Sequence, residues 1–305
     1  MDLAAKGRAR GSTHASVDRL GRLIVTGRPG YRPGQVISLE MVSEQADVSR
    51  AMAREVLQVL HQKRLVGLQP RVGATVRPVE QWDVFDPDVI EWRLDVAPRF
   101  QMRSLTEVRQ AIEPSAAFLA AERASADVCR DLVSLSRQLQ ELGKDDRFRQ
   151  DNQTGKGIRE DYRDVDAQFH RALLKGSQNE MFYALADPVE KALNYRIQKD
   201  WEGTRGQGSG AGGNKRFPVS PSLLSPWLHR GLAAAVEQGH PSAAETFSRA
   251  ILVEVHTDPL PLLIGIALEH ALAVLDPRCM DADGRGWEQF EAAVRAAIRN
   301  ARADS

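Results

Sequence analysis

The chain has 305 residues, of which 42% are hydrophobic, so it is long enough to form two domains with apolar cores. No stretch approaches the roughly 18 apolar residues of a membrane span, and the basic N-terminus lacks the apolar segment of a secretory signal, so we expect a cytoplasmic protein without a membrane partner. Cys129 and Cys279 lie far apart and belong to no CxxC pair, which argues against a disulfide framework or a thiolate zinc site.

The net charge of zero conceals an uneven distribution of charge. Residues 1–78 carry 13 Lys and Arg against 6 Asp and Glu, whereas the remaining residues carry 28 against 35. A basic first quarter can neutralise nucleic-acid phosphates locally even when the whole chain is neutral. The distribution therefore favours a DNA-binding module at the N-terminus, with chance clustering as the alternative.

Three short helices followed by a hairpin are predicted in the first quarter of the chain. The first has an apolar face from Val17 to Ile24 and is stopped by the glycines and prolines of residues 27–34. Ser49 is the expected N-cap of the third helix. Helix, helix, helix, hairpin is the order of a winged helix-turn-helix. The later elements of this module are predicted as helices at about 39–46 and 50–60 and strands at about 65–68 and 74–77.

From Asp86 onward the pattern is helical nearly throughout, so the fold class expected is mainly α, a winged helix-turn-helix followed by an all-α bundle. A polar stretch at 144–156 and a Gly-, Pro- and Ser-rich stretch at 203–226 interrupt the pattern, and the second predicts a flexible loop. Amphipathic and apolar segments predict helices at about 86–97, 102–123, 125–142, 157–175, 178–200, 224–238, 241–255, 260–275 and 287–302.

These patterns also predict where the domains begin and end. Each boundary falls where composition or periodicity changes. The expected parts are a flexible N-terminus (1–16), a winged helix-turn-helix domain (17–78), a linker helix (79–100), an all-α domain (101–255) that contains the flexible insertion (203–226), and a C-terminal helical extension (256–305).

The third helix carries the side chains that a DNA-reading helix requires. Ser49, Arg50 and Arg54 lie at or near its N-terminal end, and the two arginines are four residues apart and share one helix face. Side chains at this end of a recognition helix reach the base edges and phosphates of the major groove. Arg71 and Gly73 fall in the adjacent hairpin. A solvated charged face on an ordinary helix is the alternative interpretation.

A second constellation lies in the helical region. Asp166 and His170 are four residues apart on a predicted helix, so a carboxylate oxygen and an imidazole nitrogen can meet one metal ion, and His229 is a third candidate ligand. Such a set would suit zinc, nickel or manganese. The alternatives are polar groups hydrogen-bonded within a pocket and a metal-dependent hydrolase. The chain has no HExxH motif, nucleophile elbow or phosphate loop to support the hydrolase.

Several segments resemble a known family. The runs LGRLIVTGRPGYRPGQVI and VSRAMAREVLQVLHQKRLVGLQPRVGATVRP resemble the GntR winged-helix signature, in which VSR, RE, GLV and G-x-x-V fall at these intervals. The resemblance covers about residues 17–253, and FDPDVIEWRL is most similar to regulators of sugar-acid catabolism. Later segments resemble the FadR branch with its helical ligand-binding (FCD) domain: QWDVFDPDVIEWRL, SLTEVRQAIEPSAAFLAAERAS, DVDAQFHRALLKGSQNEMF and HRGLAAAVEQGHPSAAETFSRAIL.

The resemblance implies a transcription regulator that binds double-stranded DNA and is not an enzyme. A homodimer on an inverted repeat is expected, because one winged helix offers too little surface for selective binding. Some relatives carry an arginine where this chain has Glu40, whose carboxylate would repel phosphate. The implied DNA contacts are Ser49, Arg50 and Arg54 on the recognition helix and Arg71 and Gly73 on the wing.

The resemblance also implies how a ligand is sensed. The family uses the Asp and His of D-x-x-F-H with two later histidines as metal ligands, and here the last of these falls at Ile251, which cannot ligate. His256, five residues on, would substitute only if the helix broke there. Arg109 matches a position that often holds a carboxylate effector, such as a sugar acid, in relatives. The alternative for Arg109 is a surface arginine paired with Glu113 at i+4.

Overall fold

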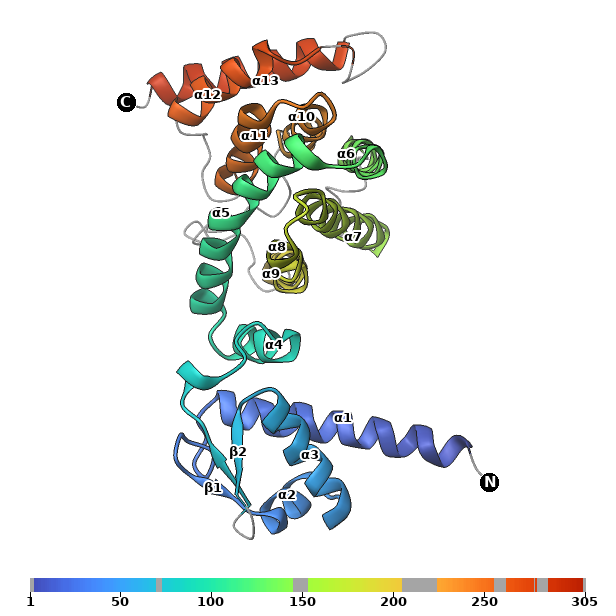
Figure 1. The fold of residues 1–305 in the computed structure, drawn as a ribbon, viewed down its shortest axis with the longest axis vertical. Coiled ribbons are helices and arrows are strands. Elements are labelled where there is room, and N and C mark those ends of the chain that lie inside the picture. Colours follow the sequence, from blue (N-terminus) through green and yellow to red (C-terminus); the bar gives the residue numbers. More distant parts are fainter. Residues whose placement is uncertain are drawn as a thin grey trace. The chain divides into compact units, whose positions relative to one another are not determined.

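A computed structural model of the chain describes residues 3–69, 73–144, 153–204, 224–254, 262–276, 278 and 285–303. The chain forms two compact units, residues 1–103 and 104–305 (Figure 1). The first unit contains a small sheet among helices, and the second is built from helices (Figure 1). The predicted fold class, a winged helix-turn-helix followed by an all-α domain, is confirmed. No described helix is long and apolar enough to cross a membrane.

The first unit has the predicted order of elements. Strand β3 lies in the middle of an antiparallel sheet of order β1-β3-β2, and β2 and β3 form the hairpin with Leu68 opposite Ala74. The elements are α1 (Leu3–Val25), β1 (Val36–Ile37), α2 (Leu39–Ala46), α3 (Arg50–Gln62), β2 (Val66–Gln69), β3 (Gly73–Val76), a 3₁₀ turn η1 (Val79–Gln81) and α4 (Pro87–Val96).

Local sequence explains the bounds of the short helices. Ser49 Oγ accepts a hydrogen bond from Met52 N at 3.3 Å, which confirms Ser49 as the N-cap of α3, and Ser38 caps α2 in the same way. Helix α1 begins at Leu3 and so includes most of residues 1–16, which the sequence predicted to be flexible.

Helix α4, expected in a separate linker, packs into the core of the first unit. Val89 and Trp92 are buried there with residues of α1, and Trp92 Nε1 donates to Asp18 Oδ1 at 2.7 Å. Gly21 of α1 lies against the Trp92 ring, so that a Cβ added at Gly21 would lie 2.3 Å from a ring atom. Lys63 Nζ, just past the end of α3, contacts carboxylates at the start of α4. Residues 79–96 therefore belong to the first unit.

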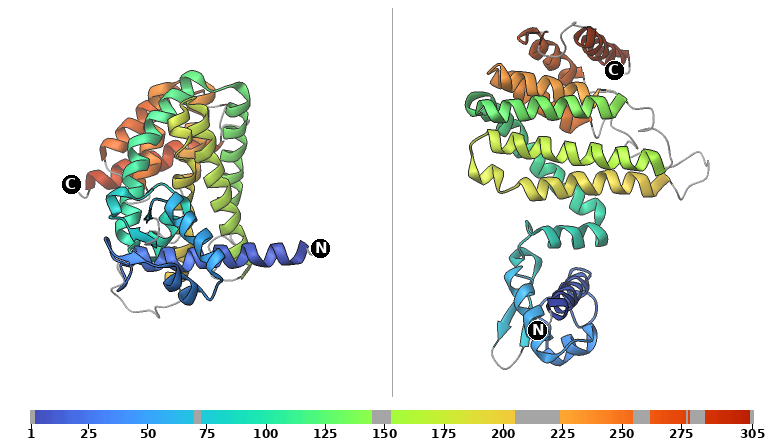
Figure 2. Two further views of the ribbon diagram at one scale, coloured as in Figure 1. Left: turned by 60° about the horizontal axis from the view of Figure 1, so that its bottom comes forward. Right: turned by 90° about the vertical axis from the view of Figure 1, so that its right-hand side faces the viewer.

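The second unit is built from antiparallel and crossing helices. Helices α6, α7 and α9 run roughly side by side in Figure 2 (right), and α10 packs against α6 and α11. Amphipathic faces of these helices form one apolar core, and a smaller core lies between α5, α7 and α9. The helices are α5 (Pro98–Arg123), whose first residues belong to the first unit, α6 (Ala126–Lys144), α7 (Gln153–Gly176), α8 (Glu180–Tyr183), α9 (Ala186–Thr204), α10 (Ser225–Glu237), α11 (Pro241–Glu254), α12 (Leu262–Ala273) and α13 (Arg285–Ala303).

Two features of the second unit differ from the sequence-based expectation. The single helix predicted at 178–200 is divided into α8 and α9, because Pro188 would clash with the carbonyl of Ala184 inside a continuous helix but is tolerated in the first turn of α9. The C-terminal extension packs into the main core through Leu268, Phe290 and Val294. The flexible loop predicted at 203–226 falls largely on residues outside the described part of the chain.

Candidate functional site

Helix α3, the predicted recognition helix, presents both predicted arginines to solvent. Arg50 and Arg54 are exposed on α3, while the opposite face of the helix buries Val56 and Leu60 in the core of the first unit. The polar and apolar requirements of the helix therefore fall on different faces, as expected. Ser49 is also exposed, although its hydroxyl is used for the N-cap.

Glu40 contacts the first of these arginines. Its carboxylate forms an exposed ion pair with the Arg50 guanidinium, from the first turn of α2 to the first turn of α3. A backbone hydrogen bond, the Ser38 hydroxyl and the charge of Arg50 together hold the pKa of Glu40 below its usual range. Glu40 is thus a carboxylate at neutral pH, placed where it competes with any phosphate or base for Arg50.

Gly73 has a structural requirement of its own. Its φ is +116°, and a Cβ at this position would lie 2.5 Å from the carbonyl oxygen of Ile37. Only glycine fits this close approach of β3 to β1. The predicted wing contact Arg71 lies outside the described residues.

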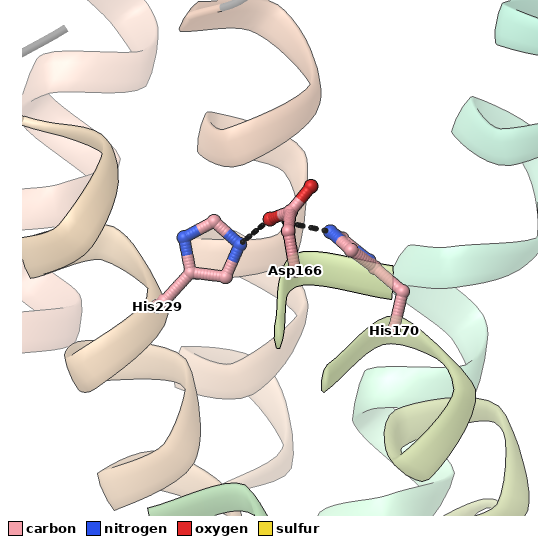
Figure 3. Close-up of side chains that lie close together, drawn as sticks. All are labelled: Asp166, His170 and His229. Atoms are coloured by element: carbon pink, nitrogen blue, oxygen red, sulfur yellow. Dashed lines mark ion pairs between the residues drawn. The ribbon is translucent and has the colours of Figure 1, made fainter. Parts of the chain in front are cut away.

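The predicted sensing residues meet inside the second unit. Asp166 and His170 come from α7 and His229 comes from α10, and all three side chains are buried. Asp166 lies between the two imidazoles (Figure 3), with its Oδ1 3.2 Å from His229 Nε2 and 3.8 Å from His170 Nε2. Ligand atoms of the three residues lie within 4.8 Å of one another. Among the described residues, these three form a group of His, Cys, Asp or Glu side chains that could hold a metal ion.

The far side of each imidazole has an acceptor that orients the ring. His229 Nδ1 lies 2.8 Å from the carbonyl oxygen of Ser225, one turn earlier in α10, and His170 Nδ1 lies 2.7 Å from Glu113 Oε2. In a neutral imidazole the hydrogen bond to Ser225 places the proton of His229 on Nδ1 and leaves its Nε2 lone pair directed at the centre of the cluster. His170 Nδ1 makes no well-aligned hydrogen bond, but the nearby Glu113 carboxylate favours a proton on the same nitrogen by charge. Outer acceptors of this kind typically orient metal-binding histidines.

This donor set fits a divalent metal. Ligand atoms about 2.0–2.2 Å from an ion lie roughly 3–3.5 Å apart, close to the distances found between Asp166 and the imidazoles. Ile251, where the family resemblance implied a further histidine ligand, is buried in the apolar core on α11 and supplies no donor. The alternative ligand His256 lies outside the described residues.

Arg109 lies beside this cluster on α5. Its Nε donates to Glu113 Oε1 at 2.5 Å, so the pair with Glu113 that the sequence offered as an alternative does form. The pair is buried rather than at the surface, since Arg109 is 7% exposed and Glu113 is fully buried. Arg109 Nη2 also lies 3.4 Å from His170 Nε2. Arg109 therefore reaches the candidate metal site.

Glu113 is the site residue that the sequence did not single out. Burial alone would raise the pKa of Glu113, but the charge of Arg109 and the contact with His170 lower it to about 2. The carboxylate is therefore ionised and holds Arg109 and His170 together. Its i+4 spacing from Arg109 was the available signal, but the contact with α7 depends on tertiary packing.

Comparisons with known proteins agree with both units. Residues 15–76 match the family of bacterial regulatory proteins named gntR, and residues 104–254 match the FCD domain. The galactonate operon transcriptional repressor of Escherichia coli K12 is 32% identical over 194 residues, which are 63% of this chain and 78% of that protein. The uncharacterized regulator YieP of the same organism is 27% identical over 57% of this chain and 71% of its own.

Among solved structures, a GntR protein of Streptococcus agalactiae matches 80% of this chain and 98% of its own at 19% identity, with a TM-score of 0.40.

The matched families and the galactonate operon repressor are regulators, so the metal-dependent hydrolase has no support. The chain belongs to the GntR family of bacterial transcriptional regulators and carries an FCD domain C-terminal to its winged helix-turn-helix in the sequence.

Proposed function

We propose that the protein is a transcriptional repressor that binds an operator as a homodimer and releases it when a small carboxylate binds the FCD domain. The observation that carries this proposal is the buried cluster of Asp166, His170 and His229 with Arg109 beside it, in a different unit from the DNA-reading helix. The similarity to a galactonate operon repressor supports a sugar acid as the ligand class. A regulator of bacterial genes acts in the cytoplasm, where the chromosome lies.

The DNA-binding half of the proposal rests on α3. Arg50 and Arg54 are exposed at its N-terminal end, and arginine makes specific bidentate contacts with guanine and binds phosphates. Two copies related by a twofold axis would place two such helices on the half-sites of an inverted repeat. Ser49, Arg71 and Gly73 are proposed as additional contacts from the cap and the wing.

The sensing half rests on the charge and shape of Arg109. A guanidinium stays charged and offers a planar fork that matches a carboxylate. Arg109 is buried, and an ionic contact in a buried site is little screened by solvent. Arg109 is therefore suited to select an acid over a neutral sugar.

We further propose that Asp166, His170 and His229 hold one divalent ion, zinc, nickel or manganese. Three protein ligands leave coordination positions for the oxygens of a carboxylate or water. The ion would supply a second positive group for the sugar acid. Because Ile251 contributes no donor, we expect weaker metal binding than a site with four protein ligands would show.

The test is calorimetric titration of sugar acids, galactonate among them, into the wild type and Arg109→Met, each with and without a chelator. We expect the binding acid to lose at least about tenfold in affinity when Arg109 is replaced, because an ionic hydrogen bond of about 1.5–3 kcal/mol is removed. In the wild type, removal of the metal by the chelator should also weaken binding of the acid. Equal binding by both proteins would refute the role of Arg109.

A further inference from the structure

The Arg109 guanidinium contacts two different groups with one edge. Its Nε and Nη2 lie 2.5 and 3.4 Å from the two oxygens of Glu113, and the same Nη2 lies 3.4 Å from His170 Nε2. All three side chains are buried. Glu113 also faces the other nitrogen of the His170 ring, at 2.7 Å. Arg109, Glu113 and His170 therefore form a closed triangle of contacts.

The contact between Arg109 and His170 uses the atom that a metal ion needs. Arginine is only a donor, so His170 Nε2 must be the acceptor in this contact. A neutral imidazole nitrogen has a single lone pair in the plane of the ring. The same nitrogen is the one directed toward Asp166 and the proposed ion. The lone pair cannot serve Arg109 and a metal ion at the same time.

Charge acts in the same direction as this competition. The guanidinium is positive at any physiological pH, and a divalent cation bound to His170 Nε2 would lie within a few ångström of it. Repulsion between two cations is strong in a buried site. Glu113 holds the guanidinium beside His170 by a two-nitrogen contact from the next turn of α5, so Arg109 stays at this position unless another carboxylate draws it away.

We propose that Arg109 competes with the metal ion for His170 Nε2 and so lowers the affinity of the site for metal. This inference rests on the proposed metal site of Asp166, His170 and His229. It gives Arg109 a second role, in addition to binding a carboxylate. An acid that draws the guanidinium away frees His170 Nε2 for the metal.

The test is the affinity of the metal-stripped full-length protein for Ni²⁺, measured by competition with a chelator of known affinity. Arg109→Met keeps the length of the side chain but removes both the donor and the charge. We expect it to bind Ni²⁺ about tenfold more tightly than the wild type, because the competing hydrogen bond and the repulsion are both lost. A role confined to folding or to ligand binding would not tighten metal binding.

Arg249→Met is the matched control. Arg249 pairs with Glu245 at the same i,i+4 spacing on α11, but at the surface, so its removal should leave the affinity for Ni²⁺ unchanged. Arg109→Lys is a second variant in case the buried methionine prevents folding. Lysine keeps a charge beside Glu113 but lacks the planar fork that reaches His170, so we expect tightening of smaller size.

The outcomes separate this inference from the proposed function. If the wild type binds Ni²⁺ and no folded Arg109 variant binds it more tightly, Arg109 does not compete with the metal, although the proposed metal site itself is supported. If neither the wild type nor the variants bind Ni²⁺, Zn²⁺ or Mn²⁺, the proposed metal site is wrong and the competition falls with it. Equal tightening in Arg249→Met would also overturn the inference, because the effect would then be one of general charge.

Discussion

Replacing Gly21 with alanine tests whether α4 belongs to the DNA-binding unit. The new Cβ would lie 2.3 Å from the Trp92 ring, so the ring must move by about 1 Å or more to reach ordinary contact. Trp92 has little room to move, because it is 2% exposed and its Nε1 is bonded to Asp18. Overpacking of this kind costs about 1–3 kcal/mol, and displacement of the indole from its site would cost about 3–5 kcal/mol.

The helical preference of alanine acts in the opposite direction. A glycine-to-alanine change inside a helix contributes about 1 kcal/mol of stability when nothing obstructs the new methyl group. We therefore expect Gly21→Ala to lower the free energy of unfolding of the first unit by about 2 kcal/mol overall. Gly157 in α7 is the matched control, since a Cβ added there would have no neighbouring atom within 4 Å and Gly157→Ala should stabilise.

The assay is urea unfolding of the full-length variants, followed by tryptophan fluorescence and circular dichroism. Gly21→Ala in a Trp92→Leu background should cost much less than in the wild type, because the obstructing ring is absent. If Gly21→Ala stabilises the protein as Gly157→Ala does, Trp92 does not cover Gly21 in solution, and the assignment of α4 to the first unit is wrong.

The remaining predictions concern the two proposed sites and the acid stability of the first unit. Arg50→Ala and Arg54→Ala should each weaken operator binding by about 1–3 kcal/mol in a gel-shift assay, and unchanged affinity in both would remove α3 as the reading helix. Ile251→His should tighten Ni²⁺ binding by about tenfold or more if this position faces the site, whereas Ile251→Gln should not. Burial would raise the pKa of Asp18, but hydrogen bonds from Arg22 and Trp92 lower it overall, so its stabilising contribution is present above its usual pKa and is lost as the pH falls through the folded value. Thermal melts between pH 5 and 3 should accordingly show a smaller loss of stability for Asp18→Asn than for the wild type, and equal slopes would contradict this.

Features set by local sequence could be predicted well. The N-cap at Ser49, the buried face of α3 and the hairpin follow from residues within a few positions of one another, and the structure has them where expected. Asp166 and His170 share a face because they are one turn apart in a helix. His229 joins them from α10, as the family resemblance implied.

Features set by tertiary contacts could not be predicted. The fit of Trp92 over Gly21 joins positions on different helices, and no periodicity in either helix signals it. Glu113 has the spacing of an ordinary ion-pair partner for Arg109, and only the packing of α5 near α7 brings it to His170. The same applies to the C-terminal helices, whose apolar residues predicted amphipathic helices but not the core that they share with α10.

The most direct test of the proposed function is operator binding measured by fluorescence anisotropy at fixed salt, with the sugar acid that gives calorimetric binding as titrant. Coupling of about 1–3 kcal/mol predicts that the acid weakens operator binding by the wild type roughly 5–150-fold. Arg109→Met should bind the operator as tightly as the wild type without the acid, because reading and sensing reside in separate units, and it should need at least about tenfold more acid for release. Release of Arg109→Met at the same acid concentration as the wild type, or loss of operator binding by that variant without the acid, would contradict the account.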